Sequence, residues 1–388
     1  MRQVDAFSSL QIGEEVSRNR LGLAPMNTGL VDHVGCPNQG FDTFHELYAS
    51  AGVGVVFIGG VAVSRVGAAS ARSLVLDNID KASGLGKTAS LIRKHDAVPV
   101  LQLMHAGRQA DLMEIGTQIV APSPIPCPVL GVMPKELSIS DIAGIVGDFS
   151  KAAEYAYLAG IRVVELHAAH GYLIAEFLSP YTNKRADAYG GSFKGRFRLL
   201  SEVIGAVRSL RDLAVGVRIS GEEFVEEGIH LEDLPVLVKA IQDSGAAYVS
   251  VSAGVYDIND RIMPDRQEGE AVYAHLGRAA KEVAKIPILL SGNVGSLRTV
   301  RRLLNEGCAD FVLLGRALLA DPWLVSKSLT GNVKAVQPCT MCRICKYHSR
   351  GLPHIACPHN ESLWHLLRAT VREARTGTGL IKPKPLLK

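Results

Sequence analysis

Eight short apolar runs recur along the chain, and each is followed by a longer amphipathic stretch. The runs are rich in Val, Ile and Leu and nearly continuous, which is typical of parallel strands that are buried on both faces. Eight strand–helix units in a chain of 388 residues predict a (β/α)8 TIM barrel. The runs occupy residues 21–25, 53–60, 98–105, 161–167, 214–220, 246–253, 286–292 and 310–316.

The stretches between the runs carry helix signals. We expect one helix to begin at Ser140, one at Ser192 and one at Ser296, and we expect Gly307 to end the third. The competing architecture is an open, doubly wound sheet, which usually has a Gly-rich fingerprint after its first strand. The segment LGLAPMNTG has no such fingerprint, so we predict that residues 1–330 form the barrel.

The composition is that of an ordinary globular protein, with 47% hydrophobic and 21% charged residues and a net charge of +4. A charge this small and dispersed does not indicate nucleic-acid binding. The first residues lack the apolar segment of a secretory signal, and no apolar run reaches the roughly 18 residues of a membrane span. We therefore expect a cytoplasmic protein without a membrane span. A homo-oligomer is compatible with this composition.

Glycine-rich turns follow the last two predicted strands, at Gly292-Asn293 and at Gly315-Arg316. Loops in this position of a barrel commonly bind a phosphate group through backbone N–H groups. The alternative is that these glycines only form tight turns. Because Arg316 directly follows Gly315 and can form a charged contact, the phosphate interpretation is favoured.

Two histidines, His167 and His170, stand at the end of the fourth predicted strand, and Tyr172 follows them. The imidazoles could bind a metal, but no third ligand stands nearby. They could donate hydrogen bonds to a substrate oxygen, as in an oxyanion hole, with Tyr172 as a proton donor. The third interpretation is that they are core histidines.

Four of the seven cysteines lie close together near the C-terminus, in the pattern C-x2-C-x2-C-x11-C. Iron–sulfur ferredoxin segments contain the same three-cysteine run, and a Pro follows their last cysteine, as Pro358 does here. Structural zinc usually takes cysteines as separated pairs, so we favour a [4Fe–4S] cluster over zinc or free thiols. We predict that residues 331–388 form the cluster segment with a C-terminal helix and tail. The predicted ligands are Cys339, Cys342, Cys345 and Cys357.

Several of these motifs together resemble a known family. They include NRLGLAPMNT, QLMHAGR, VVELHAAHGYLIAEFLSPYTNKRADAYGGS, VGVRIS and LLGRALLADP. With the four cysteines they resemble the Old Yellow Enzyme family of flavin oxidoreductases. Within that family the chain is similar to the iron–sulfur branch, which contains 2,4-dienoyl-CoA reductase and trimethylamine dehydrogenase. The resemblance covers roughly residues 15–365.

The resemblance implies FMN at the mouth of the barrel and a role for each candidate residue. His167 and His170 would bind the substrate carbonyl, and Tyr172 would donate a proton. The four cysteines would hold the cluster. The residues implied for FMN are Pro25, Met26 and Asn27 along the flavin, Gly60 through its backbone, Gln102 at the pyrimidine, Arg218 at N1 and O2, and Gly292, Asn293, Gly315 and Arg316 at the phosphate.

The chain departs from the family pattern at three points. Asn27 stands where a covalent-flavin subgroup has cysteine, so we expect FMN to bind non-covalently. Of a Glu-Asn-Arg motif after GGS only Arg196 is present. About thirty residues follow Cys357 without a GxGxxG motif, so we expect no FAD or NAD(P)H domain within this chain.

The resemblance implies reduction of a carbon–carbon double bond conjugated to a carbonyl or thioester. Electrons would enter through the cluster from an external donor, such as a ferredoxin, another flavoprotein or NAD(P)H. The alternative is a flavin-dependent amine or C–H dehydrogenase or demethylase that exports electrons through the cluster. A third interpretation is an electron-transfer subunit without catalysis.

Overall fold

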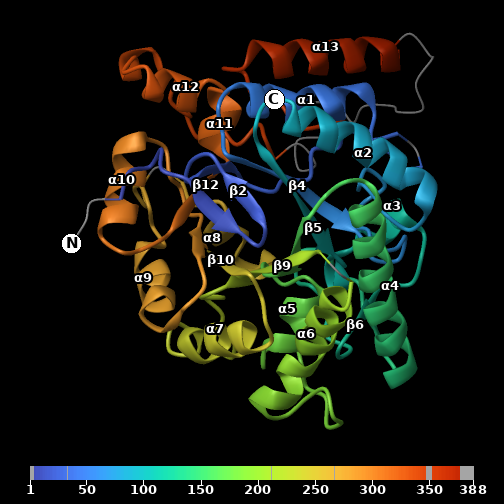
Figure 1. Ribbon diagram of the computed structural model, residues 1–388. Helices are drawn as coiled ribbons and strands as arrows, with labels where there is room; N and C mark the ends of the chain where they lie inside the picture. Colours follow the sequence, from blue (N-terminus) through green and yellow to red (C-terminus); the bar gives the residue numbers. More distant parts are fainter. Residues whose placement is uncertain (1–3, 33, 211, 266, 347–351, 376–388) are drawn as a thin grey trace.

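The computed structural model describes residues 4–32, 34–210, 212–265, 267–346 and 352–375. Eight parallel strands close into a barrel with helices around it (Figure 1), which confirms the predicted fold. Neighbours along the chain are neighbours in the barrel, and the last strand pairs with the first. The strands are β3 (Leu21–Leu23), β4 (Val55–Ala62), β5 (Val98–Met104), β8 (Val163–Ala168), β9 (Ala214–Ser220), β10 (Tyr248–Ser252), β11 (Ile288–Leu290) and β12 (Phe311–Leu314).

Helices connect successive strands and form the outer layer of the barrel (Figure 1). Their buried faces and the outward faces of the strands share one large apolar cluster. The connecting helices are α1 (Gln39–Ser50), α2 (Ile79–Arg93), α4 (Ile139–Leu158), α6 (Phe193–Arg208), α7 (Leu234–Asp243), α9 (Ala274–Val283) and α10 (Leu297–Asn305). Two shorter helices, α11 (Arg316–Ala320) and α12 (Leu324–Leu329), follow the last strand.

The helix signals in the sequence are confirmed with one small shift. Ser192 and Ser296 are the N-caps of α6 and α10, and Gly307 follows the end of α10 with a φ of 69°. Helix α4 begins at Ile139, slightly earlier than predicted, because Ser138 is the N-cap. The Ser138 hydroxyl accepts the Asp141 N–H, and the Asp141 carboxylate accepts the Ser138 N–H, which forms a capping box.

The barrel interior is filled by side chains. A second apolar cluster lies there, and Phe57, Tyr248 and Phe311 are among its members, all nearly inaccessible to solvent. Ile12 joins them from a hairpin of β1 (Leu10–Ile12) and β2 (Glu15–Ser17). Since the interior is packed, a ligand site belongs at the carboxyl ends of the strands, as in other barrels.

The loops at those carboxyl ends carry further short elements. They position side chains over the barrel mouth, and several of them contribute to the site described below. They are η1 (Gly107–Gln109), α3 (Leu112–Ile115), β6 (Val120–Ala121), β7 (Lys135–Glu136), α5 (Leu173–Leu178), η2 (Tyr256–Ile258) and α8 (Asn259–Ile262).

The chain after α12 contains η3 (Val333–Ala335), the four cysteines and α13 (Glu361–Arg375). Helix α13 lies beside α1 (Figure 1), and a Cβ added to Gly40 of α1 would be 3.3 Å from Leu366. Ile355 N–H donates to the Thr28 carbonyl at 2.8 Å, which ties this segment to the loop after β3. Residues 347–351 and 376–388 of the predicted cluster segment lie outside the described residues, and its start at residue 331 stays a prediction.

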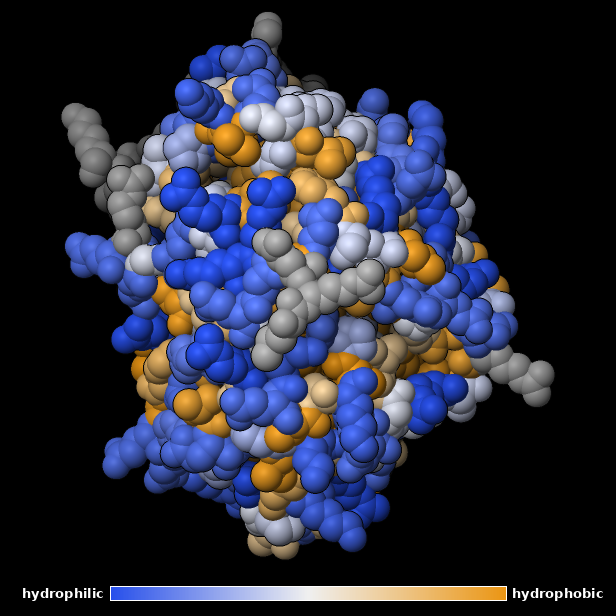
Figure 2. Space-filling model, turned by 60° about the vertical axis from the view of Figure 1, so that its left-hand side comes forward, coloured by the Kyte–Doolittle hydropathy of each residue, from blue (hydrophilic) through white to orange (hydrophobic). Residues whose placement is uncertain are grey.

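Polar residues cover most of the face in Figure 2, and apolar residues form small separate patches between them. Within the described part of the chain, no helix combines the length and apolar character that a membrane crossing requires.

Candidate active site

A cavity of about 460 Å³ opens at the carboxyl ends of the barrel strands. Every residue predicted from the sequence for FMN or for catalysis lines it, so the fold brings together residues from seven of the eight barrel strands or the loops that follow them. These residues are Pro25, Met26, Asn27, Gly60, Gln102, His167, His170, Tyr172, Arg218, Gly292, Asn293, Gly315 and Arg316.

The two imidazoles form a pair on one wall of the cavity. The His167 and His170 ring centroids are 5.2 Å apart at an interplanar angle of 76°. Burial holds the pKa of both well below the usual value, and the nearby charge of Arg218 lowers the pKa of both further. Both rings are therefore neutral at pH 7, so each carries a single N–H.

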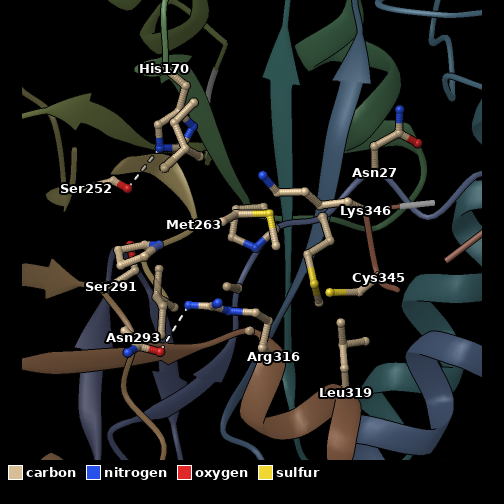
Figure 3. A pocket seen from close by; sticks show the side chains of 18 of the residues that line it. Asn27, His170, Ser252, Met263, Ser291, Asn293, Arg316, Leu319, Cys345 and Lys346 are labelled. Carbon is tan, nitrogen blue, oxygen red and sulfur yellow. Dashed lines mark hydrogen bonds between the residues drawn. The ribbon is translucent and has the colours of Figure 1, made fainter. Parts of the chain in front are cut away.

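The hydrogen bonds of this pair define how each ring is held. Ala169 N–H donates to His167 Nδ1 at 3.3 Å, which leaves the ring proton on Nε2. His170 Nε2 lies 2.8 Å from Ser252 Oγ (Figure 3). The His170 backbone has a φ of 61°, a left-handed conformation that costs a non-glycine residue about 1–3 kcal/mol and is common at functional sites.

A pair of phenols adjoins the histidines. The Tyr172 ring stands edge-on to His167, with centroids 4.7 Å apart. Its hydroxyl lies 2.8 Å from the hydroxyl of Tyr256, which comes from the loop after β10. Burial raises the pKa of Tyr256 above its usual value, so its hydroxyl keeps its proton at neutral pH. The sequence indicated Tyr172 as a site residue, but the pairing with Tyr256 has no signal in the local pattern.

A buried guanidinium lines the cavity. Arg218 on β9 is 5% exposed and pairs in register with His167 on β8. It donates to Ser250 Oγ at 2.9 Å and to Ser291 Oγ at 2.8 Å. Such a charge needs a compensating group.

Glu165, two residues before His167 on β8, supplies that group. Its side chain is completely buried; burial raises its pKa, and the charge of Arg218 opposes this. Gln102 Nε2 donates to Glu165 Oε1 at 2.7 Å, which fixes the orientation of the Gln102 amide. Sequence reasoning missed Glu165, although an acidic residue inside an apolar strand was a usable signal.

One end of the cavity has the features of an anion site. Arg316 donates to Asn293 Oδ1 at 3.0 Å (Figure 3), and its Nη1 is buried without a hydrogen-bond partner among the described residues. Gly292 has a φ of 147°, and a Cβ there would lie 2.7 Å from Tyr273. A buried unpaired N–H costs about 1–3 kcal/mol, so this end is suited to a phosphate.

The loop after β3 and strand β4 form another wall. Met26 pairs with Gly59 in an isolated bridge, which places Pro25, Met26 and Asn27 along the cavity. A Cβ at Gly60 would lie 2.4 Å from Met104 Sδ. A side chain at Gly60 would therefore displace Met104, which also lines the cavity.

The four cysteines occupy different environments around the mouth. Cys339 and Cys345 line the cavity, Cys342 is exposed and Cys357 is buried. Figure 3 shows Cys345 on the wall opposite His170. Burial raises the pKa of Cys345 to about 11; Arg316 lowers it and the other three thiols raise it, so the four sulfurs lie close enough to interact.

The backbone between the cysteines is bent in an unusual way. Met341 and Arg343, which separate the first three cysteines, both have a φ of 59°. Met341 N–H donates to Cys339 Sγ at 3.4 Å. Such N–H···S contacts and left-handed residues suit a loop that turns several sulfurs toward one group. Among the described residues, no group of three or more His, Cys, Asp or Glu side chains is spaced to hold a metal ion.

The comparison with known families decides the classification. The sequence model of the NADH:flavin oxidoreductase / NADH oxidase family matches residues 5–334. The chain belongs to this family. Membership confirms the resemblance drawn from the sequence motifs and places the chain among flavin-dependent oxidoreductases that use FMN.

Two curated relatives show the extent of the match. An NADH oxidase of Thermoanaerobacter brockii is 37% identical over 344 residues, which are 87% of this chain and 52% of the relative. An NADPH dehydrogenase of Geobacillus sp. strain WCH70 is 34% identical over 319 residues, which are 82% of this chain and 91% of the relative. The chain thus spans about half the length of the first relative and nearly the whole of the second.

The fold also matches a solved structure over most of the chain. Histamine dehydrogenase from Rhizobium sp. 4-9 superimposes with a TM-score of 0.84 at 24% identity, over 93% of this chain and 52% of that chain. At this identity the likeness shows the fold alone.

The cavity fits FMN on its own features. The unpaired Arg316 N–H matches a phosphate, and the buried Arg218 charge matches an electron-rich ring edge. The wall formed by Pro25, Met26 and Gly60 matches a flat ring system. The donor set of four thiols fits an iron–sulfur cluster in its chemistry.

Proposed function

We propose that this protein reduces a carbon–carbon double bond conjugated to a carbonyl or thioester, with FMN bound non-covalently in the cavity. The observation that carries the proposal is the arrangement of two neutral imidazoles and a phenol on one wall. That wall offers N–H donors for an oxygen and an O–H donor for a carbon. Both are needed when a conjugated carbonyl takes up a hydride and a proton.

His167 and His170 bind the carbonyl oxygen of the substrate in this scheme. The free N–H of His167 Nε2 donates to that oxygen, and His170 acts beside it once its ring nitrogen exchanges Ser252 for substrate. These donors stabilise the negative charge that builds on the oxygen, and they make the β-carbon electrophilic. Because the rings are neutral, they bind without an ionic charge of their own.

Tyr172 gives its proton to the α-carbon. Its hydroxyl shares a hydrogen bond with that of Tyr256, in which either phenol can donate, so the Tyr172 oxygen is held in place before substrate arrives. FMN supplies the hydride when bound, and that chemistry is the cofactor's own.

The residues that would hold FMN are those predicted from the sequence. Pro25, Met26, Asn27 and Gly60 would line the ring system, and Gln102 and Arg218 would bind its pyrimidine edge. Gly292, Asn293, Gly315 and Arg316 would bind the phosphate.

We further propose that Cys339, Cys342, Cys345 and Cys357 hold a [4Fe–4S] cluster, which carries single electrons. Residues 331–388 would then be the cluster segment attached to the barrel of residues 1–330. The names of the relatives, NADH oxidase and NADPH dehydrogenase, support a nicotinamide as the external donor. A ferredoxin or another flavoprotein is the alternative donor.

Product analysis tests the reaction. FMN-loaded protein with dithionite as reductant should convert enones or enoyl thioesters to saturated carbonyl compounds with the carbonyl group intact. The variant with both His167→Ala and His170→Ala should lose about 100-fold or more in rate, because two charge-stabilising donors are removed. Saturated product formed equally fast by this variant would contradict the assignment.

The cluster is tested separately by iron and acid-labile sulfide content after anaerobic reconstitution. Cys345→Ser should lose iron and sulfide while FMN binding persists, and Cys36→Ser is the matched control because Cys36 lies outside the cysteine segment. Equal iron content in Cys345→Ser and the wild type would refute the ligand assignment.

A further inference from the structure

Arg108 ends the QLMHAGR motif and does not line the cavity. It is the largest of the fully buried side chains, 1% exposed, and it lies on η1 directly after β5. Its Nη2 contacts both carboxylate oxygens of Asp257, at 3.0 and 3.3 Å, and its Nη1 donates to the Pro126 carbonyl at 3.0 Å. A buried charge whose Nη2 is shared by both oxygens of one carboxylate, and whose Nη1 binds a carbonyl of another loop, fixes the two loops relative to each other.

Asp257 is enclosed on its other side as well. Its side chain is 8% exposed, and Tyr181 donates its hydroxyl to Asp257 Oδ1 at 2.7 Å. The Arg108 guanidinium lies over the Tyr181 ring, 5.3 Å from its centroid. The first residues of the loop after β10 are therefore anchored at Asp257, inside the protein.

The same arginine also holds the element that carries Tyr172. Arg108 N–H donates to Glu176 Oε1 at 2.8 Å, and Glu176 lies in α5, one turn after its N-cap Tyr172. A Cβ at Gly107 would lie 2.3 Å from Glu176 Oε1, so a glycine is needed for this close approach. The backbone of this short segment thus contacts α5, and the side chain of Arg108 contacts Asp257.

Tyr256 directly precedes Asp257, and its hydroxyl meets that of Tyr172 at 2.8 Å. The two phenols come from different loops, one after β8 and one after β10. Their contact consequently depends on what holds those loops together. Arg108 contacts both, one residue away from Tyr256 and four residues away from Tyr172.

We propose that Arg108 is a positioning residue that sets Tyr256 against Tyr172 through Asp257, and that Tyr256 supports proton delivery by Tyr172. The inference rests on the proposed function. When the Tyr172 O–H bond breaks and a C–H bond forms at the substrate α-carbon, the electron pair of the O–H bond stays on the Tyr172 oxygen. Tyr256 donates its O–H to that oxygen and stabilises the charge, and solvent later returns the proton.

Two variants and one control test this. Tyr256→Phe removes the supporting hydroxyl, and Asp257→Asn removes the charge that pairs with Arg108 while keeping the shape. Asp310→Asn is the matched control. Asp310 forms an ion pair with Lys281 at 2.8 Å and lies directly before β12, outside the loops that carry Tyr172 and Tyr256. The measurements are kcat and KM with an enone, the solvent deuterium isotope effect, and reduction of bound flavin by dithionite.

Both test variants should lose about 100-fold in kcat with KM nearly unchanged, since a misplaced proton donor costs a factor of this size. The solvent isotope effect should rise, dithionite reduction should be unchanged, and Asp257→Glu should recover part of the rate. Wild-type kcat in Asp257→Asn, or an equal loss in Asp310→Asn, would overturn the inference.

Crystal structures provide a readout without turnover. The distance between the Tyr172 and Tyr256 hydroxyls should exceed hydrogen-bonding range in Asp257→Asn and stay short in Asp310→Asn. An unchanged distance in Asp257→Asn overturns the positioning role even if the wild type reduces no enone. Failure of the wild type on every enone, with a lengthened distance, would instead refute the proposed function and leave the positioning role supported.

Discussion

Replacing Arg218 by Met tests whether the stability of the barrel depends on charge compensation between Arg218 and Glu165. Arg218 and Glu165 are buried on the neighbouring strands β9 and β8, at 5% and 0% exposure. The arginine opposes the effect of burial on the pKa of Glu165, and it donates to the hydroxyls of Ser250 and Ser291. Arg218→Met leaves the carboxyl without its cation and both hydroxyls without their charged partner.

The expected loss of unfolding free energy in Arg218→Met follows from the burial of both side chains. Removing one partner of a buried ion pair in direct contact costs about 3–5 kcal/mol of unfolding free energy; Arg218 and Glu165 interact through their charges without such a contact, so we expect a loss of about 3 kcal/mol or less. Burial already raises the pKa of Glu165, so the carboxyl can take up a proton once Arg218 is gone, which limits the cost. The double variant with Glu165→Gln should cost less than the sum of the two single variants, by about 1–3 kcal/mol.

The assay is urea denaturation of the FMN-free proteins, followed by circular dichroism, for the wild type, both single variants and the double variant. The FMN-free state separates the charge effect from cofactor binding. Additivity of the two substitutions within about 0.5 kcal/mol would show that the two charges do not interact and would refute the reasoning.

Three further predictions follow from the site. Arg316→Met should weaken FMN binding about 10- to 100-fold but leave riboflavin binding unchanged, because only FMN has the phosphate that the buried Nη1 would bind; equal losses for both ligands in fluorescence titrations would argue against this. Gly292→Ala should purify without FMN, since a Cβ there meets Tyr273 at 2.7 Å and a φ of 147° disfavours alanine; normal flavin content would contradict the close fit. Burial raises the pKa of Glu176 from 4.5 to about 8, so the folded state keeps a proton that the unfolded chain releases and stability falls as pH rises through this window. Glu176→Gln should reduce that fall in urea midpoints measured at both ends of the window, and an unchanged slope would show that Glu176 does not cause it.

The barrel was predictable because each strand is buried on both faces and therefore reads as a continuous apolar run. The bounds were less accurate where glycine interrupts a run. Gly59 and Gly60 suggest the end of a strand, yet β4 continues to Ala62, where Val61 and Ala62 pair with Leu103 and Met104 after a shift in register. Hydrogen bonding to β5, which the local sequence does not show, decides where this strand ends.

The site was predictable where its residues end a strand and less so where they lie in long loops. His167 and Arg218 follow from strand position, because the carboxyl ends of barrel strands meet at one face. Tyr256 and Asp257 lie in a polar loop whose composition carries no signal, and their partners Tyr172 and Arg108 are 84 and 149 residues away. Such pairings arise only when the closed barrel brings separate loops together.

Anaerobic stopped-flow single turnover tests the central claim most directly. Protein loaded with FMN and reduced beforehand is mixed with a panel of enones and enoyl thioesters, and oxidised protein is mixed with amines. We predict that at least one conjugated substrate restores the visible absorbance of oxidised flavin with formation of the saturated product, and that the amines leave oxidised flavin unchanged. No reoxidation by any conjugated substrate, together with flavin bleaching by an amine, would contradict the account and favour a dehydrogenase.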